Sequence, residues 1–330
     1  MSGARAQARL DALAKPPGSL GRLEKLAARL AETQGREDPR AAPRRLVVFA
    51  GDHGVVAEGI GLWPSEVTTA MMRLIRAGRS SSAALARASG TELVLVDAGS
   101  RTPLDGGGDL RVGPGTRNLA HGPAMEPAQL EAALALGART ARQAAAEGIA
   151  VLALGEMGIG NTTAAACLTA LLTGASAEAV VGPGAGATPE TLARKRAVVR
   201  EAVERARPLL HTDPRAAIAA LAGFEIAAIA GCVTEAARLG ITVVLDGFVV
   251  GAGALVAQAL EPDSLRSAIA AHRSAEPGHA VVLAALGLDP FLEWELRLGE
   301  GTGALLLLPM LDSAAALLRD VATLEEAVGG

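Results

Sequence analysis

A glycine-rich turn at residues 155–163 has the composition of a phosphate-binding site. Its sequence, GEMGIGNTT, follows an apolar run typical of a buried strand and precedes an alanine-rich stretch with helical spacing. Glycine lets backbone N–H groups approach an anion, and Asn161, Thr162 and Thr163 can cap the helix and donate further hydrogen bonds. No Lys-Ser/Thr pair follows the last glycine, so the turn is not a Walker loop. A plain strand-to-helix turn with a capping Asn explains the same residues.

A second glycine loop, GPGAG at residues 182–186, is another candidate anion site. Lys195 follows it in the next predicted helix and is one of only three lysines in the chain. Its ammonium group could pair with a phosphate bound to either loop. A solvated helix lysine is the simpler interpretation.

Other acids and histidines also follow predicted strands or precede helices. Asp52 and His53 lie in a GDHG turn, where a metal site, acid–base chemistry and an Asx turn all remain open. His272 and His279 flank the segment RSAEPG, and surface capping before a helix explains them as well as catalysis does. Because no His-x-x-x-His or comparable ligand spacing occurs, we predict neither a metal nor a cofactor.

Glu300 lies between glycines in the string LGEGTG, directly before an apolar run from Ala304 to Met310. A carboxylate at the mouth of an apolar helix would be partly desolvated, and its pKa would rise toward the working range of a general base. The alternative is that Glu300 only supplies negative charge at a helix N-terminus.

Short apolar runs alternate with longer helical segments along the chain, and several of the candidate functional residues lie in or next to the turns between them. The runs lie at residues 46–50, 92–97, 148–154 and 241–245, and the helical segments at 65–88, 126–147, 161–173, 189–210 and 224–239. This alternation predicts an α/β fold with a parallel, Rossmann-like sheet flanked by helices. Ligands bind beyond the carboxyl ends of the strands in such sheets, and the polar, glycine-rich turns that follow the runs fall at that edge.

The two ends of the chain predict a smaller helical layer. The first 35 residues contain two helical pieces, and the tail from about Asp289 again has helical character. We therefore predict a small helical domain from residues 1–35 and about 287–330, and a large α/β domain from about 36–286.

Composition excludes several classes of protein. Of 330 residues, 50% are hydrophobic and the net charge is −4, which favours a packed core over disorder and argues against a nucleic-acid surface. Cys167 and Cys232 are expected to be reduced, buried and inert, as in a cytoplasmic protein. The first residues lack the apolar stretch of a signal peptide, and residues 241–260 favour a strand, a turn and a packed helix over a membrane span.

Several longer strings occur together and in one order along the chain. They are LAKPPGSLGRLEKLA at 13–27, GDHGVVAEGI at 51–60, PSEVTTAMM at 64–72, GEMGIGNTTAAA at 155–166, LDGFVVGAGAL at 245–255, HRSAEPGH at 272–279 and LRLGEGTGA at 296–304. Over roughly residues 13–320 the chain resembles the nicotinate-nucleotide:dimethylbenzimidazole phosphoribosyltransferase family. The resemblance implies a homodimer that moves the phosphoribosyl group of nicotinate mononucleotide onto 5,6-dimethylbenzimidazole with inversion, in cobalamin lower-ligand synthesis.

The resemblance also implies roles for individual residues. Glu300 matches the general base, which takes the benzimidazole proton and typically contributes about 10²–10⁴-fold. The 5′-phosphate site corresponds to Gly158, Ile159, Gly160, Asn161, Thr162 and Lys195. Glu156, Asp246 and Ser274 fall on the ribose and nicotinate side. The benzimidazole pocket corresponds to Pro64, Ser65, Arg73, Met157 and Leu298. No metal is demanded, because the leaving group is already a pyridinium.

Two positions depart from the family pattern. Relatives commonly carry GRGTG where this chain has GPGAG at 182–186, and Arg73 stands where a Gln is expected in some relatives. These departures keep a purine or a phenol open as the acceptor. A non-catalytic nucleotide-binding or sensor protein is a further alternative, although both an anion loop and a base are retained. A kinase is disfavoured, since no Walker lysine or acidic Mg²⁺-binding set is present.

Overall fold

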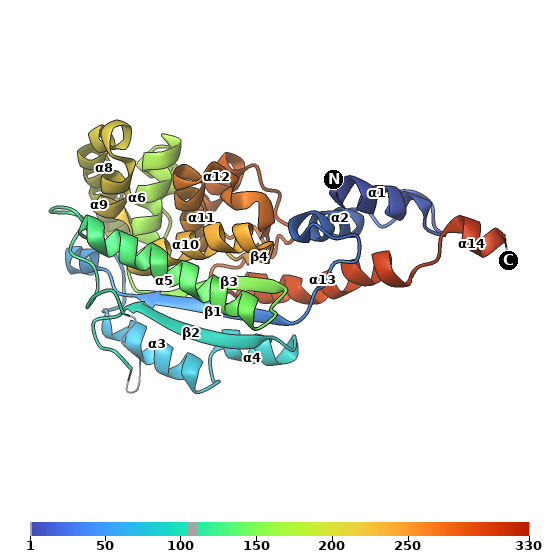
Figure 1. Ribbon diagram of the computed structural model, residues 1–330. Helices are drawn as coiled ribbons and strands as arrows, with labels where there is room; N and C mark the ends of the chain where they lie inside the picture. Colours follow the sequence, from blue (N-terminus) through green and yellow to red (C-terminus); the bar gives the residue numbers. More distant parts are fainter. Residues whose placement is uncertain (1, 105–110, 330) are drawn as a thin grey trace.

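A parallel sheet of five strands forms the centre of the molecule (Figure 1). The computed structural model describes residues 2–104 and 111–329. The strands are β1 (Arg44–Gly51), β2 (Glu92–Gly99), β3 (Val151–Met157), β4 (Thr242–Leu245) and β5 (Ala268–Ala270), in the spatial order β2-β1-β3-β4-β5. The predicted α/β class is confirmed. The sequence did not predict β5, because three residues of the type Ala-Ile-Ala do not form a recognisable pattern.

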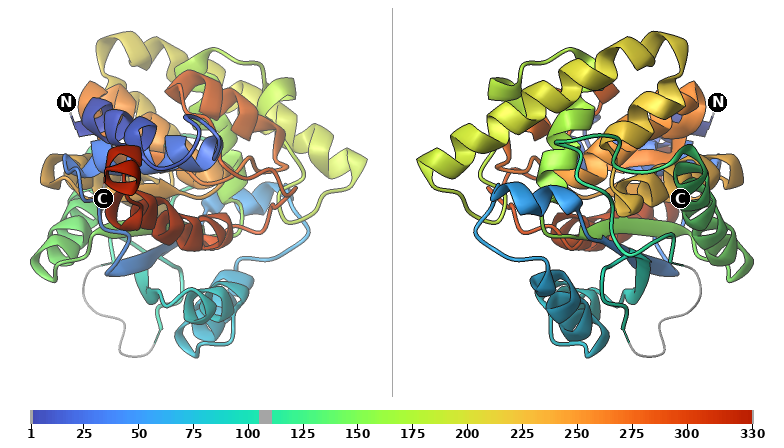
Figure 2. Two further views of the ribbon diagram at one scale, coloured as in Figure 1. Left: turned by 90° about the vertical axis from the view of Figure 1, so that its right-hand side faces the viewer. Right: turned by 90° about the vertical axis from the view of Figure 1, so that its left-hand side faces the viewer.

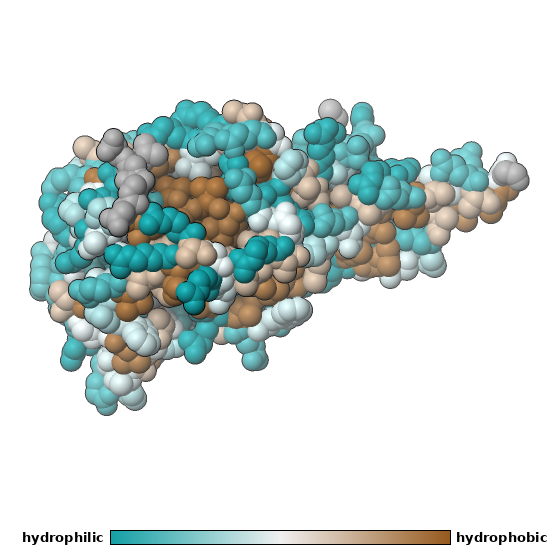
Figure 3. Space-filling model, turned by 90° about the horizontal axis from the view of Figure 1, so that it is seen from below, coloured by the Kyte–Doolittle hydropathy of each residue, from teal (hydrophilic) through white to brown (hydrophobic). Residues whose placement is uncertain are grey.

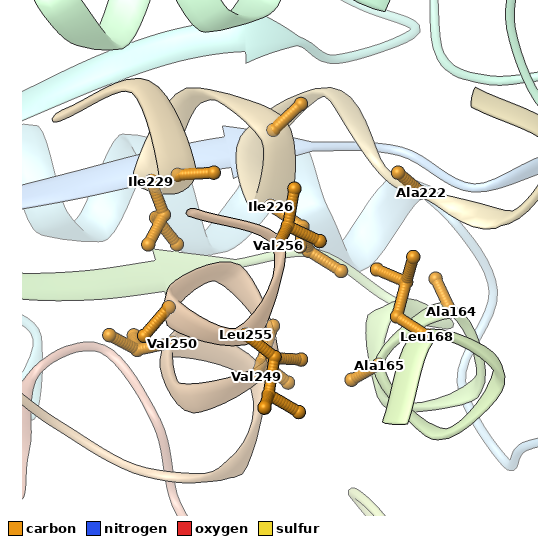
Figure 4. Close-up of a cluster of buried hydrophobic side chains, with 14 of the residues drawn as sticks. Ala164, Ala165, Leu168, Ala222, Ile226, Ile229, Val249, Val250, Leu255 and Val256 are labelled. Atoms are coloured by element: carbon orange, nitrogen blue, oxygen red, sulfur yellow. The ribbon is translucent and has the colours of Figure 1, made fainter. Parts of the chain in front are cut away.

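One face of the sheet is covered by the helices of the middle of the chain. They are α5 (Pro127–Ala146), α6 (Asn161–Thr173), α7 (Ala177–Val180), α8 (Pro189–Thr212), α9 (Pro214–Leu221), α10 (Phe224–Leu239), α11 (Phe248–Leu260) and α12 (Pro277–Leu286). Val47 and Phe49 of β1 point into this layer, as strand alternation requires. Figure 4 shows α6, α10 and α11 meeting through aliphatic side chains such as Ile226 and Val256.

The opposite face is covered by helices from both chain ends and by one helix that precedes β2. These are α2 (Arg22–Gln34), α4 (Ser81–Ala88) and α13 (Thr302–Asp320), which pack on Leu46 and Val48. The helices α1 (Ser2–Ala12) and α14 (Leu324–Val328) extend away from the sheet beside the far end of α13 (Figure 1). The core of this layer is continuous with the sheet. The domain boundaries near residues 35 and 287 stay a prediction.

Two helix predictions differ from the structure. The segment 65–88 is two helices, α3 (Glu66–Arg76) and α4, separated by a turn in which Gly78 has a φ of 70°. The prediction of helix from Asp289 is wrong up to residue 301, since α13 begins only at Thr302. Left-handed backbone at Glu295 and at residues 299–301 prevents an earlier start.

The outer edge of β2 bears a groove of about 730 Å³, which is lined by α3, α4, α5 and half-exposed residues of β2. Figure 3 views the molecule from below, on the side of α3, α4 and β2, and shows apolar surface interrupted by charged side chains. The groove runs along β2 as far as Asp97, and it shares no lining residue with the cavities of the candidate site.

Burial accounts for one long apolar helix and for both cysteines. Among the described helices only Thr302–Asp320 is long and apolar enough to cross a membrane by length and composition, and 56% of its apolar window is buried inside the protein. Cys167 and Cys232 are free and buried, as predicted, and burial raises the pKa of each thiol to about 12.

Candidate active site

The strand order reverses at the carboxyl ends of β1 and β3, where parallel sheets open a crevice. Two adjoining cavities of about 110 and 50 Å³ lie at this edge and share the turn 158–162. The right-hand view of Figure 2 looks onto this end of the molecule. Loops from six parts of the chain meet here: those after β1, β3 and β4, together with segments 182–186, 272–276 and 297–299.

The glycine turn after β3 leads directly into α6. Gly160 is the N-cap residue, with a φ of 93° and no side-chain cap, so the expectation that Asn161 caps this helix is wrong. Asn161 instead donates from Nδ2 to the carboxylate of Glu156. The backbone N–H of Ile159 donates to Thr68 Oγ1 over 3.1 Å, which ties the turn to α3. The first turn of α6 thus presents its N–H groups at the cavity.

Lys195 reaches the same cavity from α8. It is only 2% exposed, so the solvated-lysine interpretation is wrong. Its Nζ donates to Thr162 Oγ1 over 2.7 Å and to the Gly182 carbonyl over 3.1 Å. Burial lowers the pKa of Lys195 to about 8, although the nearby charge of Glu276 acts in the opposite direction. Both glycine loops therefore converge on one ammonium group.

Glu276 holds the second glycine loop in place. Its Oε1 accepts the N–H of Gly184 over 2.8 Å, and Arg297 donates to the Gly184 carbonyl over 3.2 Å. Glu276 is 5% exposed and lies within the HRSAEPGH string, but the sequence alone did not single it out. The contact with a loop 92 residues away is visible only in the fold.

Glu156 ends β3 beneath the cavity. Burial and the charges of Asp246, Glu225 and Glu300 together raise its pKa to about 8, against the hydrogen bond from Asn161, which lowers it. Glu156 is therefore mostly protonated at neutral pH in the free protein. A cation placed beside it would favour the carboxylate.

Glu156 should make stability depend on pH. Because its pKa is about 8 in the folded protein and near 4.5 otherwise, its contribution to stability is complete below pH 4.5 and falls as the pH rises to about 8. Glu156→Gln mimics the neutral acid. The fall in Tm between pH 5 and pH 8 should therefore be smaller in this variant than in the parent. Thermal unfolding at several pH values tests this, with the exposed Glu66→Gln as control. Parallel Tm curves for parent and Glu156→Gln would contradict it.

Asp246, at the end of β4, binds the start of α13. Its two carboxylate oxygens accept the backbone N–H groups of Gly301, Gly303 and Ala304 over 3.1, 2.7 and 3.1 Å. His272 Nε2 lies 3.4 Å from Asp246 Oδ1. Asp246 is 2% exposed and still lines the cavity beside Glu156. It thus anchors the segment that carries Glu300.

Glu300 has a left-handed backbone between two left-handed glycines. The φ angles of Gly299, Glu300 and Gly301 are 86°, 58° and 78°, and such a conformation costs a non-glycine residue about 1–3 kcal/mol. The turn lies so close to β3 that a Cβ on Gly155 would be 2.5 Å from the Gly301 nitrogen. The carboxylate is 3% exposed and accepts a hydrogen bond from Ser82 Oγ over 2.7 Å. Strain at a buried acid is typical of a functional residue.

The histidines of the HRSAEPGH string are buried, so the surface-capping interpretation is wrong. His279 Nδ1 accepts the backbone N–H of Ser274 over 2.9 Å. Burial, together with the charges of His272 and Arg273, lowers the pKa of His279 to about 3. A neutral imidazole thus holds Ser274 at the cavity wall.

The predicted benzimidazole residues divide into two groups. Met157 and Leu298 line the larger cavity, and Leu298 is 58% exposed at its mouth. Pro64 and Ser65 precede α3, while Arg73 lies on the exposed face of that helix. Pro64, Ser65 and Arg73 line neither cavity. Glu300 is not among the lining residues either, and its carboxylate contacts Ser82 of α4.

The GDHG turn contributes a buried ion pair beneath the crevice. His53 Nε2 lies 2.6 Å from Glu225 Oε1, and both side chains are fully enclosed. Burial alone would lower the pKa of His53, but the charge and hydrogen bond of Glu225 outweigh it and raise the pKa. Asp52 accepts the N–H of Arg101 over 2.8 Å. Within residues 2–104 and 111–329, no group of three His, Cys, Asp or Glu side chains could hold a metal ion.

Comparison with known proteins identifies the family. The family model described as Phosphoribosyltransferase matches residues 2–328. The chain belongs to this family. A nicotinate-nucleotide–dimethylbenzimidazole phosphoribosyltransferase from Thermus thermophilus is 47% identical over 327 residues, which cover 98% of this chain and 97% of the relative. The enzyme of the same name from Pseudomonas putida is 45% identical over 325 residues, which cover 98% of this chain and 92% of the Pseudomonas enzyme.

The fold agrees with this membership. The crystal structure of CobT from Thermus thermophilus superposes with a TM-score of 0.92 at 46% identity, covering 99% of this chain and 98% of that one. This phosphoribosyltransferase therefore shares both sequence and architecture with its relatives along nearly its whole length. The resemblance seen in the sequence is confirmed.

Proposed function

We propose that the protein transfers the phosphoribosyl group of nicotinate mononucleotide to 5,6-dimethylbenzimidazole. The products are α-ribazole 5′-phosphate and nicotinate, with inversion at the anomeric carbon, and the reaction serves cobalamin lower-ligand synthesis. One observation carries the proposal: in a chain 47% identical to an enzyme of that name, an anion loop, a buried lysine and a strained buried glutamate all lie at the carboxyl edge of the sheet.

The donor's 5′-phosphate binds at the start of α6. Backbone N–H groups of residues 158–162 and the helix dipole favour an anion there, and Lys195 adds a positive charge. Glu156, Asp246 and Ser274 line the neighbouring cavity, where ribose and nicotinate would lie. As the ribosyl carbon gains positive charge, the carboxylate of Asp246 stabilises it, and the same charge favours ionisation of Glu156.

Lys195→Met should weaken donor binding by about 10–100-fold at pH 7, because a charged hydrogen bond is worth roughly 1.5–3 kcal/mol. In the parent, affinity should also fall above pH 8 as Lys195 loses its proton in the free enzyme, and this fall should vanish in the variant. Calorimetric titration with nicotinate mononucleotide between pH 6.5 and 9.5 measures both effects. The exposed Lys25→Met is the control. Equal affinity and equal pH dependence in parent and Lys195→Met would remove Lys195 from the phosphate site.

The transfer step balances without a further reactant. The bond from the ribosyl carbon to the nicotinate ring nitrogen breaks, and its electron pair neutralises the pyridinium. An imine nitrogen of the benzimidazole forms the new bond from the opposite face. The other ring nitrogen then loses its proton to Glu300, whose turn lies beside Met157 and Leu298.

A panel of acceptors tests the proposed reaction. Nicotinate release from one fixed donor should require an acceptor and should be fastest with 5,6-dimethylbenzimidazole. The GPGAG loop contributes to both cavities, including the one lined by Met157 and Leu298, and its departure from the family pattern, with that at Arg73, motivates a phenol or a purine as the alternative acceptor. Faster release with a phenol or a purine would favour that alternative, and release without any acceptor would argue for hydrolysis.

The family resemblance implies a homodimer, and the two reduced cysteines favour a cytoplasmic protein. We propose that the enzyme is a homodimer and that it works in the cytoplasm, without nucleic acid, a membrane span or a cofactor. Its substrates would then be the two small molecules alone.

A further inference from the structure

Ser82 makes a direct hydrogen bond to Glu300 that the proposed reaction does not yet use. Its Oγ donates to Glu300 Oε2 over 2.7 Å, and its backbone N–H lies 3.4 Å from the same oxygen. Ser82 is fully buried and Glu300 nearly so. The two residues are 218 positions apart, so only the packing of α4 against the Glu300 turn brings them together.

The hydroxyl of Ser82 has a defined orientation. Ser80, the N-cap residue of α4, accepts the N–H of Ala83 over 3.1 Å, and its Oγ lies 2.8 Å from Ser82 Oγ. A serine hydroxyl has one proton, and that of Ser82 is directed to the carboxylate. Ser80 is therefore the donor to Ser82. This chain of hydroxyls leads from the cap of α4 to the carboxylate of Glu300.

We propose that Ser82 is a positioning residue that holds one carboxylate oxygen of the general base. With Oε2 fixed by Ser82, Oε1 faces a defined direction and takes the proton of the acceptor. A buried carboxylate on a strained turn without this restraint would sample other rotamers, and misplacement of a base slows proton transfer. The proposal rests on the proposed function, because it gives Ser82 a task only if Glu300 is the base.

Ser82→Ala should lower kcat about tenfold, since a hydrogen bond to a charged group is lost. The KM for nicotinate mononucleotide should stay unchanged, because Ser82 lies at the base and not at the donor. The acidic limb of the pH profile of kcat should move to higher pH, because the donor that favours the charged carboxylate is gone. Ser82→Thr keeps the hydroxyl and should restore most of the rate and the profile.

Ser81→Ala is the matched control, because Ser81 is exposed in the same turn of α4. It should leave kcat and the pH profile unchanged. If Ser82→Ala does not fold, Ser82→Cys keeps the volume with a weaker donor and should show the same loss and shift. An active parent whose Ser82→Ala variant keeps the parental kcat and pH profile would overturn the positioning role. A parent that transfers no phosphoribosyl group would instead overturn the proposed function.

Discussion

Glu300→Gln should turn over about 10²–10⁴ times more slowly than the parent, the usual contribution of a general base. The amide can occupy the same space and the same left-handed turn, but it cannot take the proton from the attacking benzimidazole. Donor binding should persist, because the phosphate loop and Lys195 lie elsewhere in the crevice. Steady-state rates and calorimetric titration with nicotinate mononucleotide separate the two effects.

The same segment provides a matched control for Glu300. Glu295 is an exposed glutamate with a φ of 56°, close to the 58° of Glu300. Glu295→Gln should therefore be as active as the parent. If Glu300→Gln keeps the parental turnover, Glu300 is not the base, and its only role is to place a negative charge at the N-terminus of α13.

Asp246→Asn should lower both activity and stability. The carboxylate receives three backbone N–H groups from the start of α13, and an amide offers one oxygen and an NH₂ group that faces a donor. A buried N–H left without its charged acceptor costs roughly 1–3 kcal/mol, so a loss near 2 kcal/mol in unfolding free energy is expected. The Glu300 turn would shift with it, so kcat should fall about 100-fold or more.

Asp263→Asn, in an exposed position, should change neither quantity. Denaturant unfolding and steady-state kinetics measure the pair of variants. An Asp246→Asn protein with parental stability, and with only a raised KM for the nucleotide, would show that Asp246 serves the ribose and does not anchor the turn.

The sequence predicted the sheet well because buried parallel strands leave a strong local pattern. The apolar run at 46–50 and the run at 92–97 lie within β1 and β2, and their glycine-rich ends lie at the edge where the loops meet. Local pattern also placed α6 and α10 at their observed bounds. The edge strand β5 was missed, because a run of three residues is too short to form a recognisable pattern.

The support around Glu300 could not be predicted from local pattern. Ser82 is 218 residues from Glu300 in the sequence, and Asp246 is 55 residues from Gly301. No local sequence pattern around Ser82 or Asp246 indicates that it contacts this turn. A left-handed backbone at Glu300 could not be predicted, because glutamate rarely adopts this conformation. Because of this turn, α13 begins later than the sequence predicted. Asn161 was predicted as a cap because Asn favours that position, but the helix starts one residue earlier, with Gly160 at the N-cap, and the amide of Asn161 donates to Glu156.

The most direct test is to identify the product formed from nicotinate mononucleotide and 5,6-dimethylbenzimidazole by mass spectrometry and NMR. We expect one nicotinate released for each α-riboside 5′-phosphate formed, with the new bond to a benzimidazole nitrogen. Glu300→Gln should give the same product far more slowly. Formation of free ribose 5-phosphate, or of a β-riboside, would contradict direct inverting transfer at this site.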